Sequence, residues 1–155
     1  MNWNEWFYYK DGQLYWKVST SNVKENSIAG FYSNGYRQVM LKGKSYPIHR
    51  IIYEMLVNSI PKGYQVDHIN GIKDDNRLEN LRLATNSENG RNRGVNKNNK
   101  IGVKGVSWRE DKKKYHAQIQ MNGVKKRLGY FDTIEEAANA YQKVAKEWHG
   151  EFYRS

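Results

Sequence analysis

Residues 65–71 read Gln-Val-Asp-His-Ile-Asn-Gly, which places the carboxylate of Asp67 directly before the imidazole of His68. Two amides follow, with Asn80 12 positions after His68 and Asn89 21 positions after it. An imidazole ordinarily titrates near pH ~6.5 and can take a proton from water at neutral pH. A carboxylate and an amide oxygen can hold a hard divalent cation, and a second amide can orient the ring. Together the four residues predict a site for phosphodiester hydrolysis.

Each of these residues also has an ordinary structural explanation. Asp and Asn favour turns, so the segment from Asp67 to Asn70 can be turn chemistry alone. Asn80 can cap a loop, and Asn89 can be a solvated helix residue. The joint spacing of the four residues favours the catalytic interpretation over these separate ones.

The sequence around this segment predicts small strands and short helices. Asp-Gly at 11–12 and Asn-Gly at 34–35 separate strand-like runs and are hairpin signals. From His49 to Val57 apolar residues recur at helical spacing, and the turn at 61–63 is expected to end that helix. Residues 64–93 then predict a strand, a loop, a second strand and a short helix.

Residues 46–93 resemble the HNH nucleases of phage and intron homing type, through residues 46–50, 66–71, 75–82 and 85–89. The resemblance implies a ββα-metal fold in which His68 is the general base and Asn80 orients it. It further implies that Asp67 and Asn89 bind one cation per active site. Many relatives carry His in place of Asn89, so the harder amide oxygen here favours Mg²⁺ or Mn²⁺ over Zn²⁺.

Two features near this segment leave alternatives open. His49 matches a histidine of the same family, but structural hydrogen bonding is its expected role. The aromatic residues of the N-terminal hairpins are expected to pack on the nuclease fold. Alternatively, the hairpins form a DNA-contacting ribbon, with Lys10, Lys17, Lys24 and Arg37 as its cations.

A second module is predicted after the polar, Asn-rich stretch at 94–101, which is the expected linker. Apolar and polar side chains alternate from Tyr115 to Met121, as in a strand with one buried face. Asn122-Gly123 predicts a tight turn, and Thr133 with Glu136 predicts a capping box. The helix that follows is expected to reach His149, which would lie at its negative dipole end.

Residues 102–153 resemble the Apetala-two/ethylene-response-factor DNA-binding domain, through residues 102–108, 115–119, 128–133, 135–141 and 149–152. The resemblance implies a three-stranded sheet in the DNA major groove with a helix behind it. The plant pattern has Arg where this chain has Ser107, Gln118 and Gln120, which favours a less GC-rich target. The residues expected to contact DNA, in this module and before it, are Arg91, Arg93, Lys97, Lys100, Lys104, Ser107, Arg109, Lys114, His116, Gln118, Gln120, Lys125 and Arg127.

The charge of the chain supports a polyanionic partner. Net charge is +10, and residues 90–127 alone carry 12 Lys or Arg and two acids. Such a concentration indicates nucleic acid, although a solvated basic surface is the plainer alternative. The chain has no cysteine, which excludes disulfides and thiolate zinc sites. No apolar run approaches a membrane span and no signal peptide is recognisable, so a cytoplasmic location is expected, in the bacterial host if a phage encodes the chain.

The sequence therefore predicts an α+β protein in three parts: a nuclease domain over 1–93 with its core at 46–93, a linker over 94–101 and a DNA-binding domain over 102–155. The expected function is a metal-dependent, site-directed DNA endonuclease of homing type that leaves 5′-phosphate and 3′-hydroxyl ends. It would act on double-stranded DNA as a monomer or homodimer, by nicking or by cutting both strands. The alternatives are an inactive DNA-binding regulator and an RNA-directed nuclease.

Overall fold

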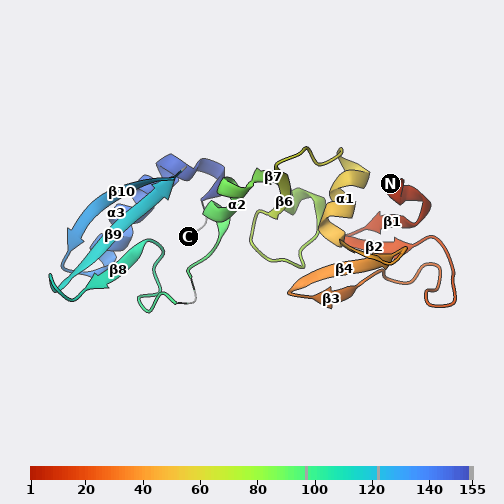
Figure 1. Ribbon diagram of the computed structural model, residues 1–155, viewed down its shortest axis with the longest axis horizontal. Coiled ribbons are helices and arrows are strands. Elements are labelled where there is room, and N and C mark those ends of the chain that lie inside the picture. Colours follow the sequence, from red (N-terminus) through yellow and green to blue (C-terminus); the bar gives the residue numbers. More distant parts are fainter. Residues whose placement is uncertain (97, 122, 154–155) are drawn as a thin grey trace. The chain divides into compact units, whose positions relative to one another are not determined.

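The computed structural model describes residues 1–96, 98–121 and 123–153 of the chain. By their internal contacts the residues form two compact units, Met1–Thr85 and Asn86–Ser155. Figure 1 shows that each unit combines small sheets or a single sheet with few helices. The predicted mixed α and β content is therefore confirmed. The domain boundaries predicted from the sequence stay predictions, and the helix that carries Asn89 lies in the second unit.

The first unit contains three small antiparallel sheets, ordered β1-β2, β3-β4-β5 and β6-β7. Its elements are η1 (Trp3–Glu5), β1 (Phe7–Lys10), β2 (Gln13–Trp16), β3 (Phe31–Ser33), β4 (Tyr36–Leu41), β5 (Lys44–Pro47), α1 (Ile48–Leu56), β6 (Tyr64–His68), η2 (Leu78–Asn80) and β7 (Leu81–Thr85).

Two-residue turns close the predicted hairpins of this unit. Asp11 and Gly12 have φ values of 48° and 78°, and Asn34 and Gly35 have φ values of 52° and 78°. Positive φ at both central residues matches the right-handed twist of the flanking strands, and Asn, Asp and Gly tolerate it best. Phe7 consequently pairs with Trp16 across β1 and β2, and Ser33 pairs with Tyr36 across β3 and β4.

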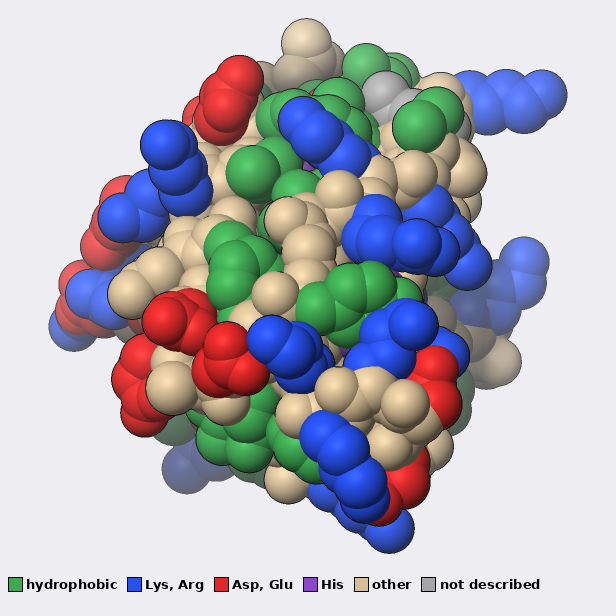
Figure 2. All heavy atoms as spheres, turned by 90° about the vertical axis from the view of Figure 1, so that its left-hand side faces the viewer, with side chains coloured by type: hydrophobic (Ala, Val, Ile, Leu, Met, Phe, Trp, Pro, Cys, Tyr) green, Lys and Arg blue, Asp and Glu red, His purple; other side chains and the backbone are tan. Residues whose placement is uncertain are grey.

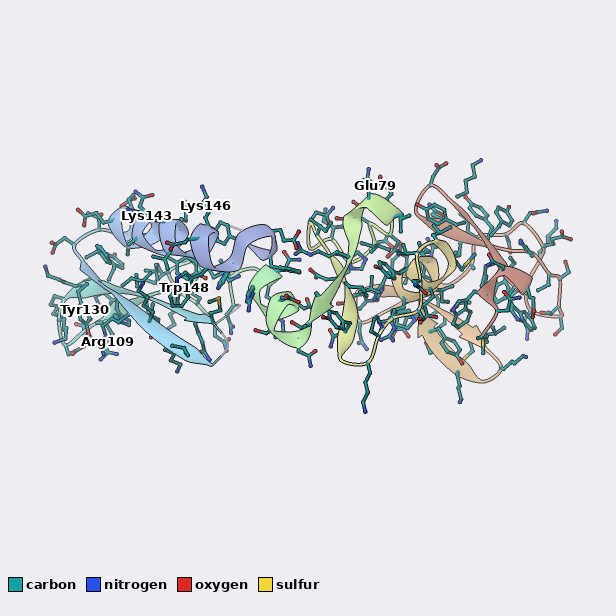
Figure 3. All side chains as sticks on the ribbon, turned by 90° about the horizontal axis from the view of Figure 1, so that it is seen from above. Glu79, Arg109, Tyr130, Lys143, Lys146 and Trp148 are labelled. Carbon is teal, nitrogen blue, oxygen red and sulfur yellow. The ribbon has the colours of Figure 1, made fainter. Side chains whose placement is uncertain are left out.

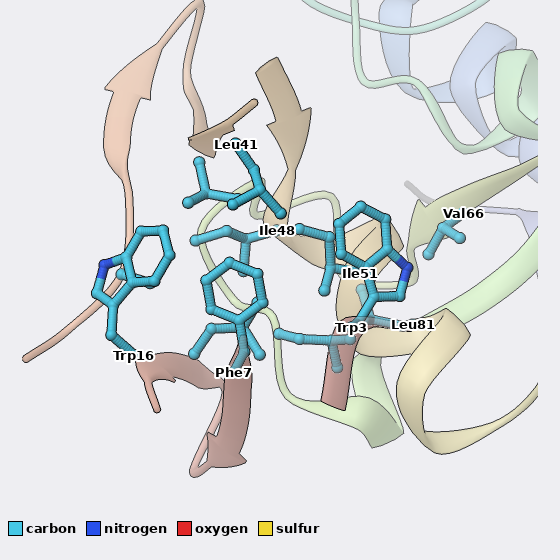
Figure 4. Close-up of a cluster of buried hydrophobic side chains, with 12 residues drawn as sticks. Trp3, Phe7, Trp16, Leu41, Ile48, Ile51, Val66 and Leu81 are labelled. Carbon is cyan, nitrogen blue, oxygen red and sulfur yellow. The ribbon is translucent and has the colours of Figure 1, made fainter. Parts of the chain in front are cut away.

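One hydrophobic core joins the hairpins to the helix and to the β6-β7 ribbon (Figure 4). This shared core confirms that the aromatic residues of the hairpins pack on the segment that carries the Asp67-His68 motif. The core residues are Trp3, Phe7, Leu14, Trp16, Ala29, Val39, Leu41, Ile48, Ile51, Ile52, Val66 and Leu81.

Helix α1 matches the predicted helical pattern within one residue at each end, but it ends before the turn that was expected to end it. It ends at Leu56, and Val57 already has φ −117° and ψ −80°. The Asn58 side chain accepts a hydrogen bond from the Ser59 backbone, a local bond that competes with helix continuation. The prediction that the turn at 61–63 ends the helix was therefore wrong, because the helix stops before it.

The second unit contains one antiparallel sheet of order β10-β9-β8. Its elements are α2 (Asn86–Asn92), β8 (Val106–Arg109), β9 (Lys114–Met121), β10 (Val124–Phe131), α3 (Ile134–His149) and η3 (Gly150–Phe152). Asn122 of the predicted tight turn lies outside the described residues.

Helix α3 packs across one face of this sheet, as predicted. Thr133 accepts a hydrogen bond from the Glu136 backbone while the Glu136 side chain bonds back to the Thr133 backbone, so the capping box is confirmed. Small buried clusters lie between helix and sheet. Their fully buried members are Val106, Ala117, Ile119, Ala137, Tyr141 and Ala145.

The packing between α3 and the sheet is close at Gly105, which has φ +73°. A Cβ at this position would lie 2.1 Å from the Tyr141 ring and 2.7 Å from the Gln118 carbonyl oxygen. Only glycine fits both the conformation and the space. Within the described ranges, none of the helices has the length and apolar composition that crossing a bilayer requires.

Candidate active site

Strand β6 carries the two central residues of the sequence motif. Val66, Asp67 and His68 are all buried, although two of them are polar. The antiparallel pairing with β7 sets Asp67 opposite Arg82 and His68 opposite Leu81. Since buried polar groups need partners, the contacts of Asp67 and His68 define what the site can do.

His68 is held by an asparagine that the sequence analysis did not select. Its Nε2 lies 2.9 Å from Asn76 Oδ1, and the two side chains are only 5% and 3% exposed. An amide oxygen accepts, so this contact favours the tautomer that is protonated at Nε2. The contact also orients the ring. The sequence offered one signal for Asn76, the Asp-Asn-Arg segment at 75–77.

Asn80 holds the loop that connects β6 to η2. Its Nδ2 donates to Asn70 Oδ1 at 3.0 Å and to the Asp75 carbonyl oxygen at 2.7 Å. Its Oδ1 accepts from the Asn70 backbone at 3.0 Å. These bonds close the loop whose far end carries Asn76. The predicted direct role of Asn80 in orienting His68 stays a prediction.

The carboxylate of Asp67 is paired with a guanidinium. Nε and Nη2 of Arg82 both lie 3.1 Å from Asp67 Oδ2, and both side chains are largely buried. This two-pronged contact holds the carboxylate in one orientation next to His68. An ion pair in this setting positions charge more than it stabilises the fold.

His49 lies beside His68. Their ring centroids are 4.9 Å apart, and Tyr36 lies 5.3 Å from His49 and 6.2 Å from His68. Burial, reinforced by the charges of His68 and Arg50, lowers the pKa of His49 to about 3. His49 is therefore neutral at physiological pH and forms an aromatic wall of the site. The sequence predicted a hydrogen-bonding role for it and did not predict this contact.

The β3-β4 hairpin and the loop 69–77 are tied together. Tyr32 donates to Asp74 at 2.5 Å, and Lys73 Nζ donates to the Asn34 carbonyl oxygen at 3.3 Å. Lys73 Nζ also lies 4.3 Å from the centre of the Tyr36 ring. The hairpin thus supports the loop that presents Asn76 to His68.

An ion pair stiffens the same loop. Arg77 Nε lies 2.7 Å from Asp75 Oδ1, and the Arg77 guanidinium holds the pKa of the Asp75 carboxyl well below its usual range. Both ends of the loop are consequently fixed around the His68 ring.

Asn89, the second predicted metal ligand, lies on α2 in the second unit. The structure brings Asp67, His68 and Asn80 together in the first unit, and the role of Asn89 stays a prediction. Among the residues that the structure describes, no cluster combines three or more His, Cys, Asp or Glu side chains in a possible metal site. A cation held by one carboxylate and amide oxygens would not produce such a cluster.

The predicted DNA contacts on β8, β9 and β10 share the sheet face opposite α3. The strand register pairs Arg127 with Gln118, Lys125 with Gln120 and Ser107 with His116. Gln118, Gln120, Lys125 and Arg127 are exposed. Figure 2 shows Lys and Arg side chains over much of this end of the molecule, with hydrophobic side chains between them.

Three of the predicted contacts differ from the rest. His116 is buried, with its ring centroid 5.1 Å from that of Tyr130, although its register position is on the exposed face. Lys104 donates through Nζ to the carbonyl oxygens of Arg91 and Arg93, so it binds the end of α2. Lys97 lies outside the described residues. DNA contact by any of this set stays a prediction.

Comparisons with known proteins agree with the geometry at Asp67 and His68. A family model described as HNH endonuclease matches residues 46–91. Protein 3.8 of Escherichia phage T7 is 35% identical over 106 residues, which are 68% of this chain and 87% of the phage protein. The chain belongs to the family of this phage protein, and its residues 46–91 carry the match to the HNH endonuclease model.

Two further relatives support the HNH domain. An uncharacterized HNH endonuclease of Acanthamoeba polyphaga mimivirus is 37% identical over 106 residues, 68% of this chain and 54% of that protein. YosQ, an inferred HNH homing endonuclease derived from the SPbeta prophage of Bacillus subtilis, is 35% identical over 60 residues, 39% of this chain and 35% of that protein. The chain thus spans about half and about a third of these two relatives. No solved structure matches the chain significantly.

The HNH family implies a nuclease that acts on DNA, and HNH nucleases generally depend on a divalent metal ion. Asp67, His68, Asn76 and Asn80 all fall inside the matched residues 46–91. Tyr32 and Tyr36 lie before the match. The N-terminal hairpins therefore add to the HNH domain a support that its family model does not include.

Proposed function

We propose that this chain is a divalent-metal-dependent DNA endonuclease of homing type that hydrolyses one phosphodiester bond at each encounter. The observation that carries the proposal is the buried contact between His68 Nε2 and Asn76 Oδ1, next to the Asp67 carboxylate. A buried amide that orients an imidazole beside a buried carboxylate is the arrangement that a general base requires, because the ring must be held in line with the water that it deprotonates.

In the proposed reaction, His68 Nδ1 takes a proton from a water molecule. The water oxygen attacks phosphorus in line and the bond to the 3′ oxygen breaks. The leaving 3′ oxygen takes a proton from solvent water and the His68 imidazolium returns its proton to solvent, so the products carry 5′-phosphate and 3′-hydroxyl ends. Asn76 keeps the ring in place by accepting a hydrogen bond from Nε2–H throughout. His49 packs edge-on against the His68 ring and Tyr36 lies beside both, which helps to keep the imidazole aligned.

The donor set around Asp67 fits a hard cation such as Mg²⁺ or Mn²⁺. Oxygen is the only ligand type that the carboxylate and the neighbouring amides offer, and Arg82 holds the carboxylate by Oδ2. Asp67 would hold the ion, with Asn89 as the second ligand predicted from the sequence. When bound, the ion neutralises charge on the phosphate and on the leaving oxygen.

The second unit would supply target selection through the exposed face of its sheet. Gln118 and Gln120 can read base edges, while Lys125 and Arg127 contribute positive charge beside them. An Apetala-two-like reader of this kind fits the sheet order and the helix behind it. A chain with one such site nicks as a monomer and needs a second copy or a second encounter to cut both strands.

The test is cleavage of supercoiled and linear duplex DNA with Mg²⁺, Mn²⁺ or EDTA, by the natural chain and by His68→Ala. We expect metal-dependent cutting that falls by about 10²–10⁴-fold in His68→Ala, while DNA binding in EDTA is unchanged. Glu79→Gln is the matched control, because Glu79 is an exposed charge near the same ribbon (Figure 3) and should leave cutting intact. Full activity in His68→Ala would overturn the proposal. Binding without cutting under every condition would support the regulator instead.

A further inference from the structure

The second unit contains a pocket that the proposed reaction does not use. Its volume is about 430 Å³, and it lies where α2, the segment before β8, the β9-β10 hairpin and α3 meet. The residues that line it include Arg91, Lys104, Gln118, Gln120, Lys125 and His149.

The lining of this pocket is positively charged. Arg91, Lys104 and Lys125 contribute cations from three different segments, and none of the described lining residues is Asp or Glu. Three cations without a carboxylate among them favour an anion in the space they surround.

His149 is the most informative member of the lining. It is the last residue of α3 and is 5% exposed. Neither of its ring nitrogens makes a hydrogen bond of good geometry to the described residues, and the Gln120 backbone offers the ring a weaker contact. Burial lowers the pKa of His149, and the nearby charges of Lys104 and Arg91 lower it further, against the opposite effect of that Gln120 contact. A buried imidazole without a well-formed hydrogen bond costs stability unless a ligand supplies one.

Two contacts position the Lys104 segment at the pocket. Lys104 is anchored by its bonds to the carbonyl oxygens of Arg91 and Arg93. Gly105, which follows it, is pressed against Tyr141 and leaves no room for a side chain there. The ammonium of Lys104 is consequently held at the edge of the pocket.

We propose that this pocket binds a phosphate oxyanion, with an N–H of His149 donating to one oxygen and Lys104 and Arg91 balancing the charge. The phosphate can belong to the DNA backbone or can be free inorganic phosphate. The proposal goes beyond cleavage, since it concerns only the second unit and needs neither His68 nor a metal ion.

The first arm of the test uses inorganic phosphate and the ring ¹H–¹⁵N resonances of the histidines in the full chain, assigned with His149→Gln. We expect the His149 signals to shift and saturate with a dissociation constant on the order of 1 mM, while those of His116 stay in place. Lys104→Gln should weaken this binding by at least about 5-fold. Lys146→Gln, on the face of α3 that points away from the sheet (Figure 3), should not.

The second arm measures binding of a 20-base-pair duplex in EDTA, so that loss of cleavage has no influence. If the pocket holds a backbone phosphate, Lys104→Gln and His149→Gln each weaken binding about 3–10-fold, and Lys104→Gln lowers the salt slope by about 0.9. Saturable phosphate shifts with unchanged duplex binding would assign the pocket to free phosphate. No His149 shift, or an equal shift at His116, together with unchanged duplex binding, would overturn the proposal.

Discussion

The two candidate sites of this chain are built in opposite ways. In the first unit the reacting groups Asp67 and His68 are buried, and each is held by a specific partner, Arg82 or Asn76. In the second unit the residues expected to meet DNA are mostly exposed side chains on an open sheet face. The comparison indicates that a single substitution in the first unit will strongly reduce cleavage, whereas a single substitution in the second unit will weaken DNA binding only in part.

The hydrophobic cores that support the two sites also differ, in size and in aromatic content. The first unit has one cluster that includes Trp3, Phe7 and Trp16, whereas the second unit has small clusters built mainly on Ala and Val or Ile. Precise chemistry requires positions held within fractions of an ångström, and a large aromatic core provides that rigidity. Groove contacts adapt to the nucleic acid and tolerate a thinner core.

The largest expected effect comes from Phe7→Ala in the first unit. Phe7 is fully buried, and removing its ring should cost about 3–5 kcal/mol of unfolding free energy. Because the second unit has its own clusters, we expect cleavage to be lost while binding to a selected duplex remains. Chemical denaturation and duplex binding measured on the same preparation check this. Parallel loss of both activities would show that the units do not fold independently.

A pH-dependent loss of stability should follow from His49. Its pKa is about 3 in the folded chain against 6.5 when unperturbed, so the unfolded chain binds more protons between these values. The stabilisation from keeping His49 neutral is therefore complete above pH 6.5 and is lost as the pH falls toward 3. The loss should reach roughly 2–3 kcal/mol two pH units below the unperturbed value. Urea unfolding of the natural chain and of His49→Leu checks it, because the variant should show a flatter pH dependence. Identical slopes would contradict the buried neutral state.

Asn76→Ala tests whether the contact to His68 is catalytic positioning or packing. We expect kcat to fall about 10–100-fold with little change in DNA affinity, as for other groups that orient a reacting side chain. Asn76→Asp keeps an acceptor oxygen and should recover part of the activity. It should also move the acidic limb of the kcat profile to higher pH, because a carboxylate favours the charged imidazole. If both variants lost kcat equally and kept the pH profile of the natural chain, Asn76 would be a packing residue only.

The sequence predicted those features that depend on local chemistry. The Asp11-Gly12 and Asn34-Gly35 turns and the Thr133 capping box are encoded within a few residues, and the structure contains all three. Asp67 and His68 were found because they are adjacent. Asn76 was missed because its contact with His68 depends on how a whole loop closes, through Asn80 and Tyr32.

The sequence did not predict the surroundings of His49 and His149, for the same reason. The nearness of His49 to His68 depends on how α1 packs on β6, which residue spacing does not encode. The buried ring of His149 depends on where the Lys104 segment lies against α3. Such contacts between distant segments carry no periodic signal, so they become visible only in the folded chain.

The smallest expected effect separates the two faces of the C-terminal sheet. Arg127 and Lys126 are adjacent, exposed and equal in charge, but Arg127 pairs with Gln118 on the open face whereas Lys126 lies 5.1 Å from the Trp148 ring on the helix side. Arg127→Gln should weaken duplex binding a few-fold and lower the salt slope by about 0.9, as the loss of one phosphate contact does. Lys126→Gln removes the same charge and should leave the slope unchanged, with at most about 1 kcal/mol of stability lost with its cation–π contact. Binding isotherms at several salt concentrations check both variants. If the two slopes fall equally, the chain is attracted to DNA by net charge alone, and the open face is not a reading surface.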